Sequence, residues 1–269
     1  MKKLYCGDGR NMKELKNDSV HLVITSPPYF DLKRYNKKEN HKDNIGDPET
    51  YDDYIKNLSS VWKECVRVLG PDGKLCINIM PVLLSGKETP FERRVVKTSI
   101  NDIENYLNST GEMYLHSLYV WDKRKIVRFS SFGSYPYPTN MFSSFPYEWI
   151  IVFAKKGKRL PVEKNIKEKS KLTHQEWRGW ATNSLWEMQP AKAKSIGHPA
   201  PFPDELPKRL IKLYSFYGDT VLDPFVGSGT TVRVAESLGR NGIGYDINPD
   251  YIKMAEKSLN KQEGKSKVR

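Results

Sequence analysis

The residues best suited to chemistry form the run Thr25-Ser26-Pro27-Pro28-Tyr29, which directly follows an apolar stretch at 20–24. An apolar stretch bounded by prolines is typical of a buried strand that ends abruptly. Two successive prolines have no backbone N–H, so their carbonyls and the preceding serine hydroxyl are left as hydrogen-bond acceptors. Acceptors beside a tyrosine ring suit a planar ring that carries an exocyclic NH₂, such as a nucleobase. The alternative is a strand-ending turn with a packed tyrosine.

A glycine-containing loop nearer the C-terminus is the second candidate site. A short apolar strand ending at Asp223 runs into this loop, and a helix-like segment follows at 232–238. Glycines let the backbone approach a ligand closely, and a helix N-terminus favours electron-rich groups. The loop lacks the third glycine of the dinucleotide pattern G-x-G-x-x-G and the lysine of a phosphate-binding P-loop. The next expected strand, 241–246, ends in Asp246, whose carboxylate is placed to accept hydrogen bonds from ribose hydroxyls.

Together, the two candidate sites resemble those of the DNA amino-methyltransferases that use S-adenosylmethionine, in the permuted order in which the catalytic motif precedes the cofactor motif. The resemblance spans almost the whole chain, and the two main motifs are jointly specific. The matching segments are Gly7-Asp8, Ser26-Pro27-Pro28-Tyr29, His198-Pro199-Ala200-Pro201-Phe202-Pro203, Asp223-Pro224-Phe225, Gly227-Ser228-Gly229-Thr230-Thr231 and Gly244-Tyr245-Asp246.

The resemblance implies S-adenosylmethionine as the cofactor and two sets of site residues. The catalytic set is Ser26, Pro27, Pro28 and Tyr29. The cofactor-binding set is Asp8, Thr25, His198, Asp223, Phe225, Gly227, Ser228, Gly229, Thr230, Thr231 and Asp246. Asp8 would meet the adenine of the cofactor; the alternative is that it caps a helix starting near Arg10. His198 is interpreted as a cofactor-side residue, since no partner has metal-ligand spacing, and no metal is expected.

The reaction that the resemblance implies is methyl transfer to an exocyclic amine of duplex DNA, on a base rotated out of the helix. The serine-first motif resembles that of cytosine-N4 enzymes, whereas adenine-N6 enzymes more often begin it with Asp or Asn; adenine-N6 transfer is the alternative. Ser26 Oγ and the Pro27 carbonyl would accept the two N–H groups of the amine, and Tyr29 would stack on the extruded base. The competing classes are an RNA or protein amine methyltransferase and a non-catalytic DNA-binding module.

Composition favours a nucleic-acid partner. The formal charge of +12 and the pI near 9.4 suit a polyanion, here double-stranded DNA. Three cysteines at wide spacing show neither a metal pattern nor a disulfide framework, and none lies in the Pro-Cys context of carbon-5 cytosine methylation. No apolar run reaches membrane length, so the cytoplasm is the expected compartment. A separate restriction endonuclease could be a partner, and the sequence leaves monomer and homodimer both open.

Alternating strands and helices predict an α/β fold with a doubly wound, mostly parallel, Rossmann-like sheet. We expect a catalytic half at 1–154, a target-recognition insert at 155–197, a cofactor-binding half at 198–260 and a basic tail at 261–269. By resemblance, one strand is antiparallel at the edge of the sheet. Further expected elements are a loop over the site at 30–48, a helix from Tyr51 to Leu69, a turn at 70–73 and a helix between 91 and 107.

The target-recognition insert is inferred from charge and tryptophans. Residues 155–171 hold eight Lys or Arg against two Glu, and Trp177, Trp180 and Trp186 follow without clear periodicity. We expect Arg159, Arg178 and the lysines of this segment to contact phosphates. The alternative is an ordinary αβ insert with a tryptophan-stabilised core. By resemblance, the aromatic loop at 129–147 helps to hold the extruded base, through one of Tyr135, Tyr137 or Phe145.

Overall fold

The computed structural model describes residues 1–30, 45–86, 89, 91–125, 132–191 and 203–266. Its central element is an eight-stranded sheet in the order β1-β12-β11-β2-β3-β9-β6-β10. The strands are β1 (Lys2–Cys6), β2 (Val20–Thr25), β3 (Leu69–Ile79), β6 (Met113–Asp122), β9 (Tyr147–Lys155), β10 (Leu185–Glu187), β11 (Thr220–Asp223) and β12 (Asn241–Asp246). Neighbouring strands are parallel except where β9 pairs with β3 and with β6. The predicted doubly wound, mostly parallel α/β sheet is confirmed.

The reversed strand is not at the edge of the sheet, where the family resemblance led us to expect it. β9 lies between β3 and β6, and β10 forms the edge beyond them. Because β9 runs against its neighbours, its first residues meet their last ones: Glu148 is opposite Trp121, and Trp149 is opposite Ile79. The N-terminal end of β9 therefore lies at the edge of the sheet where the parallel strands end.

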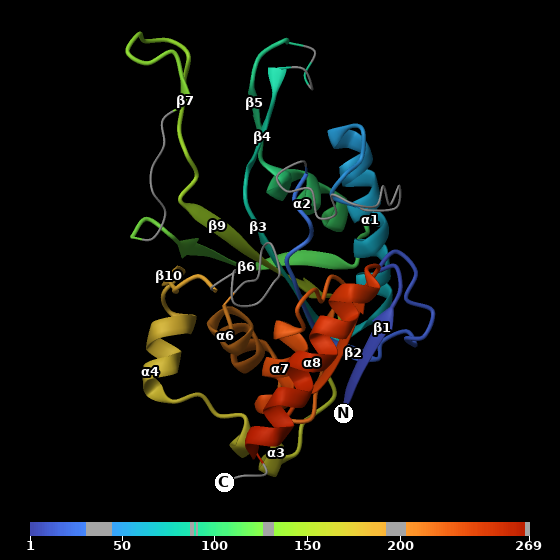
Figure 1. The fold of residues 1–269 in the computed structure, drawn as a ribbon. Coiled ribbons are helices and arrows are strands. Elements are labelled where there is room, and N and C mark those ends of the chain that lie inside the picture. The colour runs from blue at the N-terminus through green and yellow to red at the C-terminus, as the bar shows by residue number, and fades with distance from the viewer. Residues whose placement is uncertain (31–44, 87–88, 90, 126–131, 192–202, 267–269) are drawn as a thin grey trace.

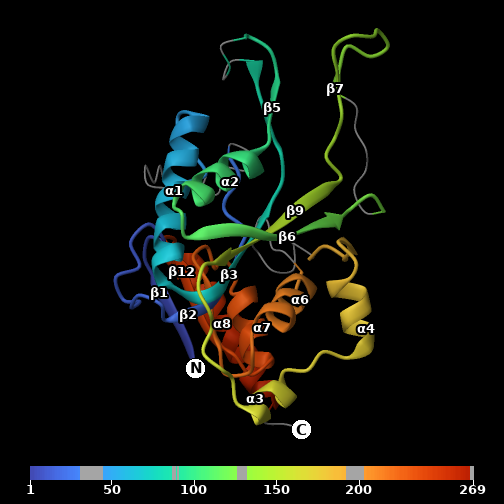
Figure 2. The same ribbon diagram turned by 180° about the vertical axis from the view of Figure 1, so that it is seen from behind.

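Helices cover both faces of the sheet (Figures 1 and 2). One face carries α1 (Tyr51–Val68) and α2 (Ser99–Ser109), and the other carries α6 (Glu205–Tyr214), α7 (Thr230–Ser237) and α8 (Pro249–Ser266). At the start of α1, Thr50 Oγ1 accepts a hydrogen bond from the Asp53 backbone N–H at 3.1 Å, which satisfies one of the free donors of the first turn. The helix predicted to begin at Tyr51 is confirmed.

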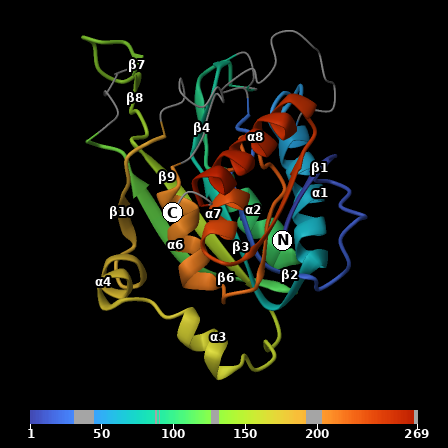
Figure 3. The same cartoon turned by 60° about the horizontal axis from the view of Figure 1, so that its bottom comes forward.

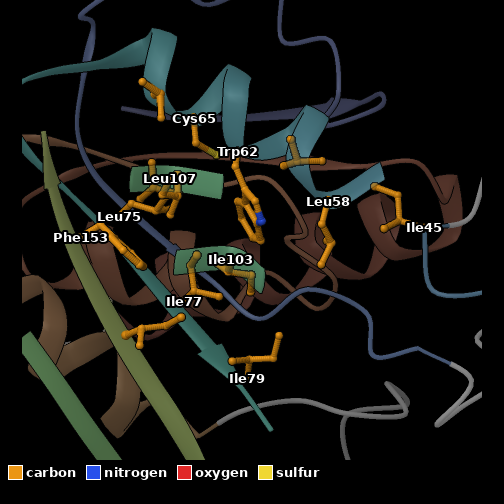
Figure 4. Close-up of a cluster of buried hydrophobic side chains, with 14 of the residues drawn as sticks. Ile45, Leu58, Trp62, Cys65, Leu75, Ile77, Ile79, Ile103, Leu107 and Phe153 are labelled. Carbon is orange, nitrogen blue, oxygen red and sulfur yellow. The ribbon is translucent and has the colours of Figure 1, made fainter. Parts of the chain in front are cut away.

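The two larger hydrophobic cores of the described residues are separate because successive strand residues point to opposite faces. Val23, Leu75 and Ile77 belong to the core under α1 and α2, whereas Leu22 and Ile24 pack toward α6 and α7. Figure 4 shows the first of these cores, where Trp62 of α1 and Ile103 and Leu107 of α2 lie against β3 and β9. Burial on both faces fixes the register of the central strands, since a slip by one residue would exchange the two sets.

Two hairpins project from the edge at which the parallel strands end (Figure 1). β4 (Val82–Leu84) and β5 (Val95–Lys97) form one hairpin after β3, and β7 (Phe132–Gly133) and β8 (Met141–Phe142) form the other between β6 and β9. The segment after β9 leaves from the opposite edge and contains the short helices α3 (Lys164–Lys169), α4 (His174–Glu176) and the π-helix η2 (Trp177–Ala181). Figures 1 and 3 both show α3 on the side of the molecule away from the hairpins.

Local boundaries differ from the sequence-based expectations at three places. Residues 70–73, expected as a turn, belong to β3, with Asp72 at a φ of 62°. The helix expected between 91 and 107 is preceded by β5, which pairs with β4, and begins only at Ser99. α8 continues to Ser266, into the expected basic tail. In the parts of the chain that the structure describes, no helix is long and apolar enough to cross a membrane.

The core under α2 predicts a large stability difference between two neighbouring substitutions. Leu107 is fully buried, whereas Asn105 on the same helix is exposed. Leu107→Ala should lower the free energy of unfolding by about 2–5 kcal/mol, because it leaves a cavity. Asn105→Ala should stay within about 0.5 kcal/mol of the wild type. Urea denaturation measures both, and equal losses would show that α2 does not pack as described.

Candidate active site

Acidic side chains gather where the parallel strands end. Asp223 and Asp246 are the last residues of β11 and β12, and Asp8 follows β1 by two residues. These three strands are adjacent in the sheet, so their carboxyl ends share one edge. Ligands of open α/β sheets bind outside this edge.

Asp223 joins the two predicted motifs. Its carboxylate accepts hydrogen bonds from Thr25 Oγ1 at 2.9 Å, from Thr231 Oγ1 at 2.6 Å and from the Phe225 backbone N–H at 3.1 Å. The residue is 1% exposed. Asp223 therefore acts inside the protein: it holds the end of β2, the glycine loop and the start of α7 together.

The glycine loop is closely packed. Gly227 and Gly229 have φ values of 48° and 82°, a region that glycine adopts without strain. A Cβ on Gly229 would lie 2.9 Å from Ala255 Cβ, so no larger residue fits between the loop and α8. The Gly227 N–H donates to Asp246 Oδ2 at 3.0 Å, and the Asn248 N–H donates to Oδ1 at 2.9 Å. Ser228 and Thr230 lie beside each other, with their hydroxyl oxygens 3.3 Å apart.

Burial raises the pKa of the Asp223 carboxyl to about 6, against the hydrogen bonds from Thr231, Phe225 and Thr25. Burial likewise raises the pKa of Asp246 to about 6, opposed by the backbone donors Asn248 and Gly227. Both groups are largely ionised at neutral pH, and their desolvated charge favours a cationic ligand. Each Asp246 oxygen also has accepting capacity beyond its single backbone bond. This donor set fits S-adenosylmethionine, which carries sulfonium and ammonium cations and ribose hydroxyls.

Asp8 is held by its neighbour Arg10. The guanidinium donates two bonds to Oδ2, at 2.6 and 2.8 Å, and the Arg10 backbone N–H donates to Oδ1 at 2.8 Å. The residues that follow form turns rather than a helix, so the alternative of a helix cap is wrong. Asp8 remains one third exposed at the ligand-binding edge of the sheet. His198, the other residue expected on the cofactor side, lies outside the described residues.

The run from Ser26 to Tyr29, expected from the sequence to be catalytic and called the catalytic run below, follows β2 directly. Ser26 and Pro28 are half-buried, whereas Pro27 is buried. The Pro28 carbonyl accepts a hydrogen bond from Tyr54 Oη at 3.0 Å, which ties the run to α1. Tyr29 is 5% exposed, and its ring belongs to the core under α1. In this structure Tyr29 thus directs its hydroxyl toward Ser26, at 3.3 Å, while protein covers its ring.

Three polar residues that sequence reasoning missed complete this site. Tyr29 Oη donates to Glu148 Oε2 at 3.1 Å, and both Asn78 Nδ2 and Lys123 Nζ also donate to the Glu148 carboxylate. Asn78 Nδ2 lies 3.4 Å from Ser26 Oγ as well. Asn78 is near the end of β3, Lys123 follows β6, and Glu148 is near the start of the reversed strand β9. A single acid directly before the apolar run 149–153 was the available signal in the sequence.

The basic segment after β9 lies at the opposite edge of the sheet. Lys155 Nζ donates to the carbonyls of Val66 and Leu69, next to the start of β3. Arg159 forms a two-bond ion pair with Asp219, at 2.6 and 2.8 Å, directly before β11. These side chains are bound within the protein, away from Ser26, so the expected phosphate contact of Arg159 is not supported by its geometry.

The tryptophans of this segment have structural surroundings. Trp186 of β10 is 1% exposed and stacks on Tyr119 of β6, with ring centroids 4.3 Å apart. Trp180 packs against the core under α6, whereas Trp177 is 56% exposed. For Trp180 and Trp186, the structure thus agrees with the alternative given from the sequence, in which tryptophans stabilise the core of the insert. Within the described ranges, no cluster of three or more His, Cys, Asp or Glu side chains could hold a metal ion.

Comparison with known proteins agrees with this geometry. Residues 20–257 match the model of the N6/N4 methyltransferase family, described as DNA methylase. Type II methyltransferase M.MjaI of Methanocaldococcus jannaschii is 33% identical over 96% of this chain and 90% of its own length. The complex of TTHA0409 from Thermus thermophilus with S-adenosyl-L-methionine superposes with a TM-score of 0.76, at 28% identity over 97% of this chain and 94% of that one. The cytosine-N4-specific PvuII DNA methyltransferase shares the fold, with a TM-score of 0.64 and 21% identity over 95% and 85% of the two chains.

The fold and the acidic, glycine-lined edge of the sheet thus define an S-adenosylmethionine-dependent methyltransferase. The chain belongs to the DNA methylase family whose members modify the N6 or N4 position.

The pKa values of Asp223 and Asp246 predict that cofactor affinity depends on pH. As pH falls through about 6, both carboxyls take up a proton and the site loses negative charge. Binding of cationic S-adenosylmethionine should weaken several-fold between about pH 7.5 and about pH 5. Isothermal titration calorimetry measures this, and Asp246→Asn should bind weakly with a smaller pH dependence. Affinity that is constant, or that rises with acidification, would contradict this electrostatic role.

The same two pKa values predict the opposite pH dependence for folding stability: acidification that weakens cofactor binding should raise the free energy of unfolding. Both folded-state pKa values exceed the usual carboxyl value of 3.8, so the folded state binds these protons more tightly than the unfolded state. Through these two groups, stability increases as pH falls from about 6 toward about 4 and decreases as pH rises through that window. Circular dichroism at each pH then separates weaker binding from unfolding.

Proposed function

We propose that this protein transfers a methyl group from S-adenosylmethionine to the exocyclic N4 amine of cytosine in double-stranded DNA. The observation that carries the proposal is the direct link between the two motifs: the Ser26 run leaves β2 next to Thr25, and Thr25 is hydrogen-bonded to Asp223 at the head of the glycine loop. An acceptor for an amine is thereby held beside a site suited to the methyl donor.

Chemical activation comes from the bound cofactor, which supplies a methyl group on a positively charged sulfur. The protein needs to align the amine, because an aromatic amine is a poor nucleophile whose lone pair is delocalised into the ring. Ser26 Oγ and the Pro27 carbonyl accept its two N–H groups and turn the lone pair toward the methyl carbon. Transfer is direct and in line, without a covalent enzyme intermediate: the bond from nitrogen to the methyl carbon would form as the bond from sulfur to that carbon breaks, and the sulfur would keep the electron pair and leave as a neutral thioether. The methylated amine then loses its proton to water.

Tyr29 has a proposed role in holding the extruded base. Stacking of a base on an aromatic ring is worth about 1–3 kcal/mol, which offsets part of the few kcal/mol that base extrusion costs. Because the ring is 5% exposed, the covering side chains must move before a base can lie on its face. In the conformation described here, the Tyr29 hydroxyl is already placed next to Ser26.

The choice of cytosine over adenine rests on the serine at the head of the catalytic run. Nucleoside analysis of duplex DNA methylated by the protein should show N4-methylcytosine, and Ser26→Ala should reduce the yield while cofactor binding stays near normal. N6-methyladenine as the sole product would overturn the base assignment and leave methyl transfer to DNA intact. Label in RNA or protein alone would reject DNA as the substrate, and no transfer at all would favour a non-catalytic DNA-binding protein.

We propose that the two hairpins at the active-site edge, rather than the segment 155–171, carry the main contacts to DNA. Arg93 and Arg94 are exposed on the first hairpin, and Phe91 beside them is 70% exposed. Tyr135 and Tyr137, at 79% and 74% exposure, form the tip of the second. Cations that neutralise phosphates and exposed rings that contact bases are the groups that DNA recognition uses. In a cell, such activity protects DNA in a restriction-modification system, with a separate endonuclease acting in the same cytoplasm.

Salt dependence distinguishes the two surfaces. Arg93→Gln with Arg94→Gln should flatten the plot of log affinity against log salt by about two units, through loss of counterion release. Lys164→Gln with Lys167→Gln, on exposed positions of α3, is the matched control and should leave the slope close to that of the wild type. Fluorescence anisotropy with a duplex at several salt concentrations measures both. The reverse pattern would return the phosphate contacts to the segment 155–171.

A further inference from the structure

The Glu148 carboxylate is the acceptor at the end of a hydrogen-bond chain that begins at Ser26. Ser26 Oγ lies 3.3 Å from Tyr29 Oη, which lies 3.1 Å from Glu148 Oε2. Glu148 is 7% exposed, and Asn78, which donates to the same carboxylate, is 2% exposed. Burying a carboxylate is costly unless it is paired and hydrogen-bonded, and here Lys123 supplies the opposite charge.

The chain has a direction because a carboxylate can only accept hydrogen bonds. Tyr29 must donate its single hydroxyl proton to Glu148, which leaves its oxygen as an acceptor. Ser26 then donates its own proton to Tyr29. Of the two lone pairs of Ser26 Oγ, one faces the Asn78 amide at 3.4 Å and the other remains for a further donor. A serine hydroxyl without such a partner is free to rotate and to present its proton instead.

We propose that Glu148 is a positioning residue that fixes Ser26 as a hydrogen-bond acceptor toward the target amine. This inference rests on the proposed function, in which Ser26 Oγ must accept an N–H of the base. Glu148 does not touch the base; it acts through Tyr29. The reversed direction of β9 makes this possible, because it brings the second residue of that strand to the edge where β2, β3 and β6 end.

The test is Glu148→Gln, which keeps the shape of the side chain but introduces an amide that can donate to Tyr29. Tyr29 can then donate to Ser26, so the serine proton can face the base. With saturating cofactor and duplex DNA, the single-turnover methylation rate should fall about 10- to 100-fold. The dissociation constant for S-adenosylmethionine, which binds at the other motif, should stay within about twofold of the wild type. Glu187→Gln, at an exposed glutamate that also pairs with a lysine, is the matched control and should leave both quantities unchanged.

Combination with Tyr29→Phe distinguishes a directed chain from a general structural effect. Tyr29→Phe already breaks the chain, so adding Glu148→Gln should slow the reaction little further. Rate losses that simply multiply in the double variant would overturn the proposal, as would a Glu148→Gln rate equal to that of the wild type.

Glu148→Gln leaves Lys123 without its paired charge, which could by itself impair folding. A second variant controls for this effect. The double variant Glu148→Gln with Lys123→Gln removes both charges and should be folded by circular dichroism yet remain slow. A fast double variant would overturn the proposal. If the wild type methylates no DNA, the proposed function fails and this inference falls with it; if the wild type is active, the variants decide on Glu148 alone.

Discussion

The buried Asp223 carboxylate is the contact on which the arrangement of the active site depends. Three hydrogen bonds, from Thr25, Thr231 and the Phe225 backbone, converge on a side chain that is 1% exposed. Two of these donors lie within eight residues of Asp223, whereas Thr25 is 198 residues away in the chain. The Asp223 carboxylate therefore fixes the end of β2, from which the catalytic run leaves, relative to the glycine loop. Methyl transfer needs this, because rates fall steeply with small displacements of the reacting groups.

A second constraint is the direction of β9. A strand that ran parallel to β3 would end, rather than begin, at the active-site edge, and Glu148 would lie at the far side of the sheet. The reversal also means that the connection from β6 to β9 leaves from this edge and returns to it, as the hairpin of β7 and β8 beside the hairpin that follows β3 (Figure 1). The antiparallel direction of β9 thus accounts both for the position of the Glu148 carboxylate near Ser26 and for the second hairpin at the same edge.

Much of this organisation is readable in the sequence because it is encoded locally. The apolar stretch before Thr25, the helical spacing after Tyr51 and the small residues from Gly227 to Thr231 each predict an element that the structure contains. Residues that act through long-range pairing are not readable in this way. Glu148 looks like an ordinary polar residue at a strand start, since its partners Tyr29, Asn78 and Lys123 come from three other segments. The location of the cations of 155–171 is hidden for the same reason: charge is visible in the sequence, but the edge of the sheet at which it lies is not. The expected DNA contacts of this segment stay a prediction.

The placement of β10 has a consequence for how the segment between β9 and α6 can change. Trp186 stacks on Tyr119, and the Met188 carbonyl accepts a hydrogen bond from the Trp121 indole at 2.9 Å, so this short strand closes the side of β6. Without it, two large rings and an unpaired strand edge would face water, a surface that promotes association between chains. Changes in this segment therefore have to keep Trp186 and Met188 in place if the side of β6 is to stay covered. If the hairpins carry the DNA contacts as proposed, their tips are different in this respect, because exposed residues such as Tyr135 and Tyr137 can change without disturbing the packing of the sheet.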